Sequence, residues 1–470
     1  MEAPVDLELT LARPATRAGV EPSATTCARV RLCMRQDQAV RPRLDLWFVV
    51  DASASMHRFV LDPDQREMWR RRAEARGEVS AQEADGRRGL VWRGQTLREL
   101  QQVVSTPMLS CLRGVWRTLE ALHSTDRICV LAFADQHGTI YEDTGVPEQA
   151  VRLEAARTQL TRLGSGVDES GLGRGTRLAG ALQEAIERVS RAEGDLSLRR
   201  MILVSDGVVE DKEACRPLVD QAVDAGLVIS VIGVGDEFEE EFLMTTADVT
   251  RGNYYYAATA PEVEQAVRSE LETVTSIVAR QALLRVIPTS GTIVREVHPV
   301  APSLSEFQTV WMEHGGWRFR IGDLSPAQPL EFLVELAAPE LPAGEGRLAL
   351  VQVEGVAPTS PDRFAVEAPI RLFYSDDPLL LQAQDDEVVD ALRRVAIYRE
   401  ERRFALAAAQ GDTEGATRHL QQATRMIRER GGGETLAAEM EAAAGELMAG
   451  TRNLARTKRV KAGTRRLSPK

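Results

Sequence analysis

Two serines and an aspartate follow a short apolar segment at alternate positions near the start of the chain. The segment Leu46–Val50 reads LWFVV, which is typical of a strand covered on both faces. Asp51, Ser53 and Ser55 come directly after it, where such a strand would emerge into a loop. Oxygen-bearing side chains that converge at a strand end suit a hard cation. The alternative is that one of these residues caps the N-terminus of a helix.

Two further polar residues have the same kind of placement. Thr176 lies in the glycine-rich turn GRGTR, just before an apolar-periodic helix, and Asp206 follows the buried strand MILVS. In a parallel sheet the carboxyl ends of the strands meet at one edge, so both residues would open onto the same edge as Asp51. The five residues that would form one cage of oxygen ligands are Asp51, Ser53, Ser55, Thr176 and Asp206.

Between residue 44 and about residue 275, short apolar strands alternate with helical segments. The expected strands are LWFVV, RICVLAFA, RMILVSDG and LVISVIGVG, with weaker ones at Gly138–Glu142 and NYYYAA. The expected helices cover residues 106–123, 148–163, 178–191, 212–225 and 261–278. This alternation predicts a doubly wound, Rossmann-like α/β domain with a mostly parallel sheet and helices on both faces.

These motifs resemble those of the von Willebrand factor A domains over about residues 46–275. DASAS, Thr176 and SDG match the three motifs of the family's metal-ion-dependent adhesion site, and DRICVLAFAD, ISVIGVGDE and RGNYYYAATAPEVEQAV match its core strands and final helix. The resemblance implies that Ser53 and Ser55 ligate the metal directly and that Asp51 and Asp206 act largely through bound water. Thr176 would act either way. Mg²⁺ fits best because it keeps several waters, with Mn²⁺ or Ca²⁺ as alternatives.

Such a site implies a binding function. Because mostly neutral hydroxyls surround the cation, its positive charge is only partly neutralised. An Asp or Glu of a partner protein can then complete the coordination shell through a charge-assisted bond. We therefore expect a metal-dependent protein–protein interaction module, or scaffold, and not an enzyme.

The enzymatic alternatives are a metal-activated water and a phosphoryl group carried by a strand-end aspartate. The sequence gives them little support. No Walker sequence GxxxxGK[ST] occurs, and GLGRG at residues 171–175 lacks the strand that precedes a dinucleotide-binding turn. His57 is the one histidine near these motifs, and we expect it in an exposed loop.

Strands with period-two alternation occur on both sides of the α/β domain. Six segments between residues 279 and 374 are punctuated by Pro and Gly, as in a β-sandwich. The N-terminal strands VDLELTLA and ARVRLCM have no core of their own and should complete that sandwich. After SDDP the chain becomes helical, with breaks at Gln410–Asp412 and RGGGE. The expected divisions are residues 1–43, 44–275 with an insertion at 56–105, 276–375, a helical region at 376–450 and a basic tail at 451–470.

The composition is that of a globular protein, with 43% hydrophobic and 27% charged residues among 470. No apolar segment reaches about 18 residues, and the N-terminus carries acids in place of an apolar signal core, so we expect no membrane association. Five cysteines without CxxC spacing favour free, buried thiols. A cytoplasmic location follows from both observations.

The sandwich and the helical region also resemble the flanking parts of a group of bacterial stand-alone proteins that carry this domain. The resemblance implies work within a multi-component stress, conflict or ATPase-linked system, with an AAA+ ATPase or another system component as partner. The alternative is a nucleic-acid-associated factor that uses its basic tail and its arginine-rich insertion. The chain has a net charge of −12, yet residues 451–470 hold eight basic residues and no acid. The tail lacks aromatic residues for base stacking, which favours a flexible basic terminus instead.

The segment 56–105 is too long for a minimal connection and is rich in arginine. The favoured interpretation is a solvated helix with flexible flanks. Because the segment leaves the chain directly after Ser55, it begins at the rim of the expected cation site, which suggests a second hypothesis. In that hypothesis arginines of the segment speed the encounter with an acidic partner surface. These arginines are Arg70, Arg71, Arg72, Arg76, Arg87 and Arg88.

Overall fold

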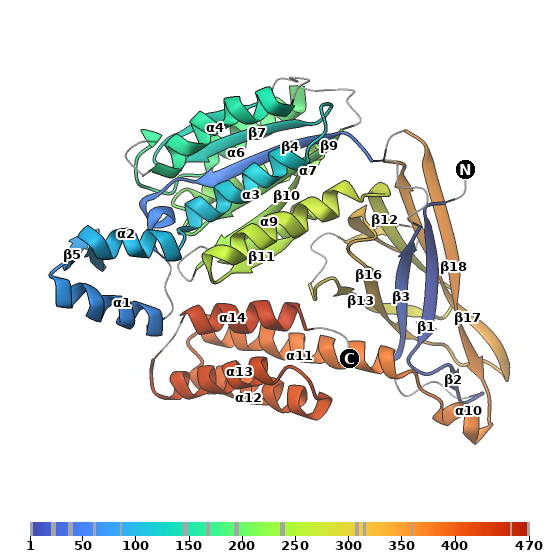
Figure 1. The fold of residues 1–470 in the computed structure, drawn as a ribbon. Helices are drawn as coiled ribbons and strands as arrows, with labels where there is room; N and C mark the ends of the chain where they lie inside the picture. The colour runs from blue at the N-terminus through green and yellow to red at the C-terminus, as the bar shows by residue number, and fades with distance from the viewer. Residues whose placement is uncertain are drawn as a thin grey trace. The chain divides into compact units, whose positions relative to one another are not determined.

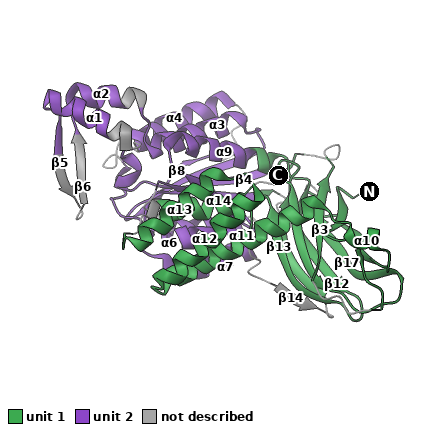
Figure 2. Cartoon of the chain, turned by 90° about the horizontal axis from the view of Figure 1, so that it is seen from below, with its two compact units in different colours: residues 1–43, 194–198, 272–470 green, residues 44–193, 199–271 purple. Residues whose placement is uncertain are grey.

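The computed structural model describes most of the chain, in two compact units that Figure 2 colours separately. Unit 1 comprises residues 1–43, 194–198 and 272–470, and unit 2 comprises residues 44–193 and 199–271. The described residues are 3–19, 25–35, 41–59, 63–84, 87–143, 149–165, 170–191, 197–235, 240–305, 310–313, 316–358, 361–451 and 454–467. No described helix is long and apolar enough to cross a bilayer.

Unit 2 is organised around a six-stranded sheet in the order β11-β10-β9-β4-β7-β8 (Figure 1). Its strands are β4 (Leu44–Asp51), β7 (Arg127–Phe133), β8 (His137–Glu142), β9 (Leu198–Ser205), β10 (Val228–Val234) and β11 (Tyr254–Ala257). The pairs β4–β7, β9–β10 and β10–β11 are parallel, and β8 runs antiparallel to β7. Every residue of β4 is buried, as the apolar segment Leu46–Val50 within it predicts. The predicted α/β fold is confirmed.

Helices cover both faces of this sheet. On one face, Trp47 and Val49 of β4 pack in one hydrophobic core with α6 (Ala179–Arg191), α7 (Lys212–Asp224) and α8 (Glu240–Thr250). In Figure 1, α3 (Pro107–Ala121), α4 (Gln149–Ser165) and α9 (Ala260–Thr275) lie on the side of the sheet away from α6 and α7. The helix α8 is absent from the sequence prediction. It is short, and its first turn carries two glutamates, so its apolar periodicity is weak.

The insertion after Ser55 folds into two helices and a hairpin. They are α1 (Pro63–Arg76), β5 (Val79–Ala84), β6 (Arg87–Trp92) and α2 (Gly94–Val103), with β5 and β6 antiparallel. Trp69 and Leu100 are buried in a small hydrophobic cluster that Phe59, Trp92 and Val104 complete. The expectation of a solvated helix with flexible flanks was therefore wrong for the described residues, because two widely spaced tryptophans give this segment a core.

Unit 1 contains the β-sandwich. One sheet has the order β1-β3-β16-β13 and the other β14-β15-β12-β17-β18-β2. The N-terminal strands are β1 (Val5–Leu11), β2 (Ala15–Thr16) and β3 (Thr26–Met34); the others are β12 (Ala279–Pro288), β13 (Ile293–Ala301), β14 (Val310–Glu313), β15 (Gly316–Leu324), β16 (Leu330–Ala337), β17 (Gly344–Val356) and β18 (Arg363–Tyr374). Because β3 pairs along its length with β16, the N-terminal strands complete the sandwich, as their alternation predicted.

The helical region belongs to the same unit. It contains α10 (Pro378–Gln382), α11 (Asp386–Ala409), α12 (Thr413–Arg430), α13 (Glu434–Met448) and α14 (Leu454–Arg465). One face of α11 packs on the sandwich through Val388, Ala391 and Val395, and other residues of α11 pack against α12 and α13. The helix breaks fall at the predicted positions, with the Asp412 side chain accepting from the Gly415 amide at 2.8 Å.

The basic tail is folded, which corrects the expectation of a flexible terminus. In α14, Val460 and Thr464 are fully buried, and Arg456 forms ion pairs with Glu439 at 2.5 Å and Glu446 at 3.0 Å. The glutamates of α13 neutralise much of the basic charge, a partnership that becomes visible only when the two helices pack together.

Candidate metal centre

Asp51 is the last residue of β4 and lies at the carboxyl edge of the unit 2 sheet. Its Oδ1 accepts a hydrogen bond from the Ser53 amide at 2.9 Å, and its Oδ2 accepts one from the Ser205 hydroxyl at 2.7 Å. Ser205 ends the neighbouring strand β9, so the two strand ends are joined directly. Asp51 and Ser205 are fully buried, which fixes the carboxylate in one orientation.

Ser53 and Ser55 bring two hydroxyls to the same place. Ser53 precedes the short 3₁₀ helix η2 (Ala54–His57) but makes no side-chain cap hydrogen bond to it, so the capping alternative does not explain its hydroxyl. Instead the Ser53 and Ser55 hydroxyl oxygens lie 2.9 Å apart. The Ser55 hydroxyl then donates to Asp206 Oδ1 at 2.7 Å. Residues 151 positions apart in the sequence are thus in direct contact.

Thr176 approaches from the loop before α6. A methyl group added at Gly207 would lie 2.8 Å from Thr176 Oγ1 and 3.5 Å from Asp51 Oδ2, so all three positions are close neighbours. Thr176 is buried and its backbone is held by Glu210, which accepts from the Thr176 amide at 3.1 Å and donates its own amide to the Thr176 carbonyl at 2.9 Å. The structure therefore brings all five predicted residues together at one edge of the sheet.

Several supporting residues escaped the sequence interpretation. Asp211 accepts from the amides of Leu178 and Ala179 at 2.8 and 3.1 Å and so caps α6, although it immediately precedes α7. Glu210 holds Thr176 and Ser205 holds Asp51, each through a hydrogen bond. All three lie in or beside the stretch MILVSDGVVED, whose density of polar residues was the available signal. Their partners are far away in sequence, which is why spacing alone did not identify them.

The electrostatics of the centre are unusual. Burial raises the pKa of Asp51, although hydrogen bonds from Ser53 and Ser205 act in the opposite direction. Burial and the charge of Asp51 together raise the pKa of Asp206 to about 8, against the hydrogen bond from Ser55 and the charge of Arg58. Two neighbouring buried carboxylates disfavour each other's ionised form. A bound cation would remove that penalty.

His57 differs from its prediction. It is half-buried in η2 and is not an exposed loop residue, and its Nε2 is buried without a hydrogen-bond partner among the described residues. Burial lowers its pKa, so the neutral ring is favoured.

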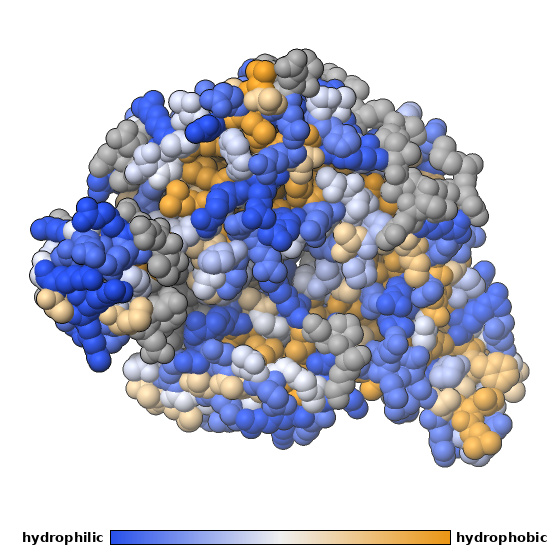
Figure 3. Space-filling model, viewed as in Figure 1, coloured by the Kyte–Doolittle hydropathy of each residue, from blue (hydrophilic) through white to orange (hydrophobic). Residues whose placement is uncertain are grey.

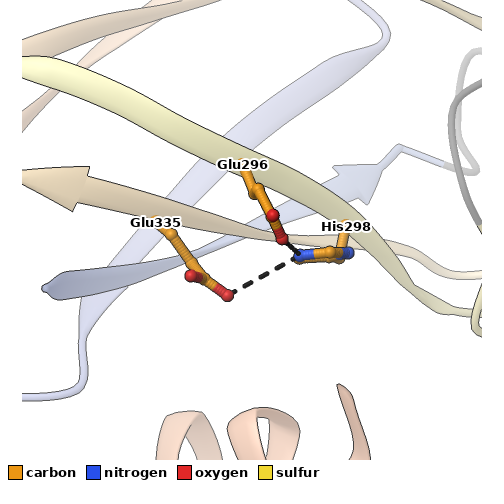
Figure 4. Close-up of side chains that lie close together, drawn as sticks. All are labelled: Glu296, His298 and Glu335. Carbon is orange, nitrogen blue, oxygen red and sulfur yellow. Dashed lines mark hydrogen bonds and ion pairs between the residues drawn. The ribbon is translucent and has the colours of Figure 1, made fainter. Parts of the chain in front are cut away.

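A second group of possible ligands occurs in unit 1. Figure 4 shows Glu296 and His298 of β13 beside Glu335 of β16, and their ligand atoms lie within 4.8 Å of one another. However, Arg399 of α11 already provides a cation here. Its Nη2 donates to Glu335 at 2.7 Å, lies 2.9 Å from His298 Nε2, and also bonds Glu296. The group therefore does not fit a metal ion, and it joins α11 to the sandwich instead.

Four of the six arginines named for the insertion form ion pairs, and the side chains of Arg87 and Arg88 lie outside the described part of the structure. Arg70 and Arg71 each pair with Glu67 at 2.8 Å, and Arg72 and Arg76 pair with Glu99 at 3.3 and 3.1 Å. These internal pairs reduce the positive field that the insertion could offer to an acidic partner. The steering hypothesis stays untested, but the described residues weaken its basis.

Comparison with known families bears on the fold of unit 2. The family model of the von Willebrand factor type A (VWA) domain matches residues 104–269. The chain contains a VWA domain. The matched range begins at the end of the insertion, whereas the structure places β4, which leads into the DASAS motif, within the same sheet. The VWA domain of this chain is therefore interrupted by residues 56–105. A second model, the Sll0103-like C-terminal alpha-helical domain, matches residues 386–470 and includes α14.

Several known proteins are similar to parts or to most of this chain. Protein sll0103 of Synechocystis sp. is 25% identical over 312 residues, which cover 65% of this chain and 71% of that protein. Protein YfbK of Escherichia coli is 28% identical over 88 residues, only 15% of its own length. A von Willebrand factor type A protein from Catenulispora acidiphila superposes with a TM-score of 0.70 at 14% identity, covering 98% of this chain and 96% of that one. The ArnB paralog VWA2 from Sulfolobus acidocaldarius gives a TM-score of 0.51 at 14% identity over 98% of this chain and 99% of that one. At such low identity these structures show the shared fold alone.

Proposed function

We propose that the carboxyl edge of the VWA sheet binds Mg²⁺ and, through it, an Asp or Glu side chain of a protein partner. Ser53 and Ser55 would hold the cation, supported by Asp51, Thr176 and Asp206. When bound, the cation would supply a coordination position for the partner's carboxylate. The protein would thus act as a metal-dependent interaction module, and we place it within a multi-component bacterial system that includes an ATPase or other protein partner.

The convergence of oxygen atoms from three separate segments carries this proposal. Ser53 and Ser55 come from the β4 loop, Thr176 from the loop before α6, and Asp206 from the end of β9. The contacts from Ser53 through Ser55 to Asp206 form a continuous set with separations of 2.9 and 2.7 Å. The donor set contains oxygen atoms only, which Mg²⁺ prefers. Zinc and copper sites normally include nitrogen or sulfur ligands, and this set has none.

Binding explains the centre better than catalysis does. A nucleophile or general base needs a carboxylate oxygen directed at substrate. Asp51 instead uses both oxygens on Ser53 and Ser205, and Asp206 is engaged by Ser55. The nucleic-acid alternative also loses support, since α14 directs Arg456 and Arg459 to Glu439 of α13. We therefore propose no catalytic activity and no nucleic-acid ligand.

The proposal is tested by capturing protein partners on the immobilised full chain, in Mg²⁺ and again in EDTA. We expect specific partners to be retained in Mg²⁺ only. Ser55→Ala should lose them because it removes one hydroxyl from the donor set. Ser190→Ala is the matched control, since that hydroxyl bonds only the Ile186 carbonyl of its own helix, at 2.8 Å.

Retention that is unaffected by EDTA, or that survives in Ser55→Ala, would contradict the proposal. Once a partner is identified, its Asp and Glu residues can be replaced one at a time by Asn and Gln. We expect one of these substitutions to abolish retention of the partner. Far-UV circular dichroism of each variant ensures that lost binding does not reflect lost fold.

A further inference from the structure

The helices α3 and α4 of the VWA domain border an apolar groove with a volume of about 630 Å³. Leu109, Leu112, Trp116 and Leu160 line it, and Leu109 is 41% exposed. Gly164 lets α4 approach α3 closely beside the groove, because an added methyl group there would lie 3.0 Å from Leu112. Hydrophobic atoms are visible in Figure 3 where α3 and α4 lie. A groove of this size can hold several apolar side chains.

Basic side chains surround this groove. Arg113 and Arg117, 52% and 58% exposed, both pair with Glu264, at 3.4 and 2.9 Å, and Arg113 also donates to the Ser110 hydroxyl at 2.8 Å. Arg157 on α4 is 70% exposed and pairs with the exposed Glu154 at 3.8 Å. Glu120 is the one acidic residue in the lining, and it accepts from the Trp116 indole at 2.8 Å. The lining itself therefore holds three arginines and one glutamate, in a chain whose net charge is −12.

The helix α10 has the opposite character. It reads PLLLQ and buries none of its residues, with Leu379 79% and Leu380 41% exposed. Phe373, just before it on β18, is 43% exposed. The surrounding sequence SDDPLLLQAQDDE contains five acidic residues and no basic one. Figure 3 shows hydrophobic atoms at the surface in the region of α10. Exposed leucines framed by acids mark a contact surface.

We propose that α10 of one copy of this chain docks into the α3–α4 groove of a second copy. Leu379 and Leu380 would enter the groove, and the flanking aspartates would face Arg113, Arg117 and Arg157. The charge complementarity selects this occupant, because one chain carries both the basic apolar groove and an acidic apolar segment. The contact joins two different surfaces, so copies assemble either reciprocally or head to tail. This inference does not depend on the proposed metal site.

Sedimentation velocity of the full chain between about 1 µM and 1 mM tests the proposal, a range that covers weak self-association. We expect the mass to increase with concentration, more strongly at low than at high ionic strength. Leu379→Asp and Leu109→Asp should each remain monomeric throughout. Both substitutions are structurally mild, since Leu379 is almost fully exposed and Leu109 lies in the first turn of α3, where an acid is favourable.

A mixing experiment distinguishes this contact from other self-association. Leu379→Asp retains an intact groove and Leu109→Asp retains an intact α10, so an equimolar mixture should form a dimer that neither variant forms alone. Ile293→Asp is the matched control, because Ile293 is 64% exposed in unit 1 and lies outside α10; it should associate like the wild type. A wild-type chain that is monomeric at every concentration, or variants that still associate, would overturn the proposal.

Discussion

At the residue scale, the candidate centre depends on how closely its oxygen atoms approach one another. Gly207 permits that approach, because any side chain there would enter the space next to Thr176. Ser205 has an equally local role, since its hydroxyl orients Asp51 from a neighbouring strand. Neither residue is an expected ligand, yet each determines where an expected ligand lies.

Gly207→Ala should therefore weaken both the fold and the centre. The added methyl group would lie 2.8 Å from Thr176 Oγ1, so the Thr176 loop must shift. We expect a loss of about 1–3 kcal/mol in the free energy of unfolding, together with at least a tenfold weaker affinity for Mg²⁺. Urea unfolding and calorimetric titration measure the two effects. Gly138→Ala is the control, since its added methyl group meets only Leu172 at an ordinary 3.7 Å. Equal behaviour of the two variants would refute this role for Gly207.

The group around His298 predicts a pH dependence of stability. Burial and the charge of Arg399 lower the pKa of His298, against the opposing charges of Glu296 and Glu335. The unfolded chain therefore binds this proton more readily than the folded chain. The resulting stabilisation is present above the ordinary histidine pKa of about 6.5 and is lost as pH falls below it.

His298→Gln should flatten this dependence, because Gln can accept from Arg399 without titrating. Denaturant unfolding of both proteins at pH 7.5 and pH 5.5 gives the comparison. The groups that face His298 are Glu296, Glu335 and Arg399, with Cys27 close to the last two. They remain in both proteins, so their own titrations largely cancel in the difference. A wild type that loses no more stability on acidification than the variant would show that His298 is not responsible.

At the element scale, caps decide where the helical region changes direction. The Asp412 side chain caps α12 through the Gly415 amide at 2.8 Å, and the Asp377 side chain caps α10 through the Leu379 amide at 2.9 Å. The two caps are chemically alike. However, α12 packs into the core of the helical region, whereas no residue of α10 is buried.

Asp412→Ala should cost about 1 kcal/mol of unfolding free energy, because the cap of a packed helix is lost. Asp377→Ala should leave the unfolding free energy unchanged, since α10 can fray without exposing core. Chemical denaturation of the two variants provides the measurement. An equal loss in both would mean that α10 is more tightly coupled to the fold than its exposure indicates.

The elements also show what the sequence could and could not predict. Buried strands such as β4 and long amphipathic helices such as α6 follow from their own periodicity, and the five centre residues follow from their positions beside those elements. The helix α14 was missed because its partners lie on other helices: Val460 enters the core of the helical region and Arg456 pairs with glutamates of α13. The insertion was misjudged because Trp69 and Leu100 form a core only across the 30 residues that separate them.

At the scale of the whole molecule, unit 1 is assembled from both ends of the chain. The strand β3 pairs with β16, and α11 covers residues from β3, β13 and β16. The VWA domain is inserted between these parts of the sequence. This organisation leaves the DASAS edge, the α3–α4 groove and α10 as three separate candidate surfaces for interaction.

The central claim, that this VWA domain binds a divalent cation through its DASAS edge, is tested most directly by calorimetric titration of Mg²⁺ into the full chain. We expect one Mg²⁺ bound per wild-type chain and no binding to Ser55→Ala, while Ser190→Ala binds like the wild type. A wild-type chain that binds no Mg²⁺, or a Ser55→Ala chain that binds it equally well, would show that the DASAS edge is not a cation site.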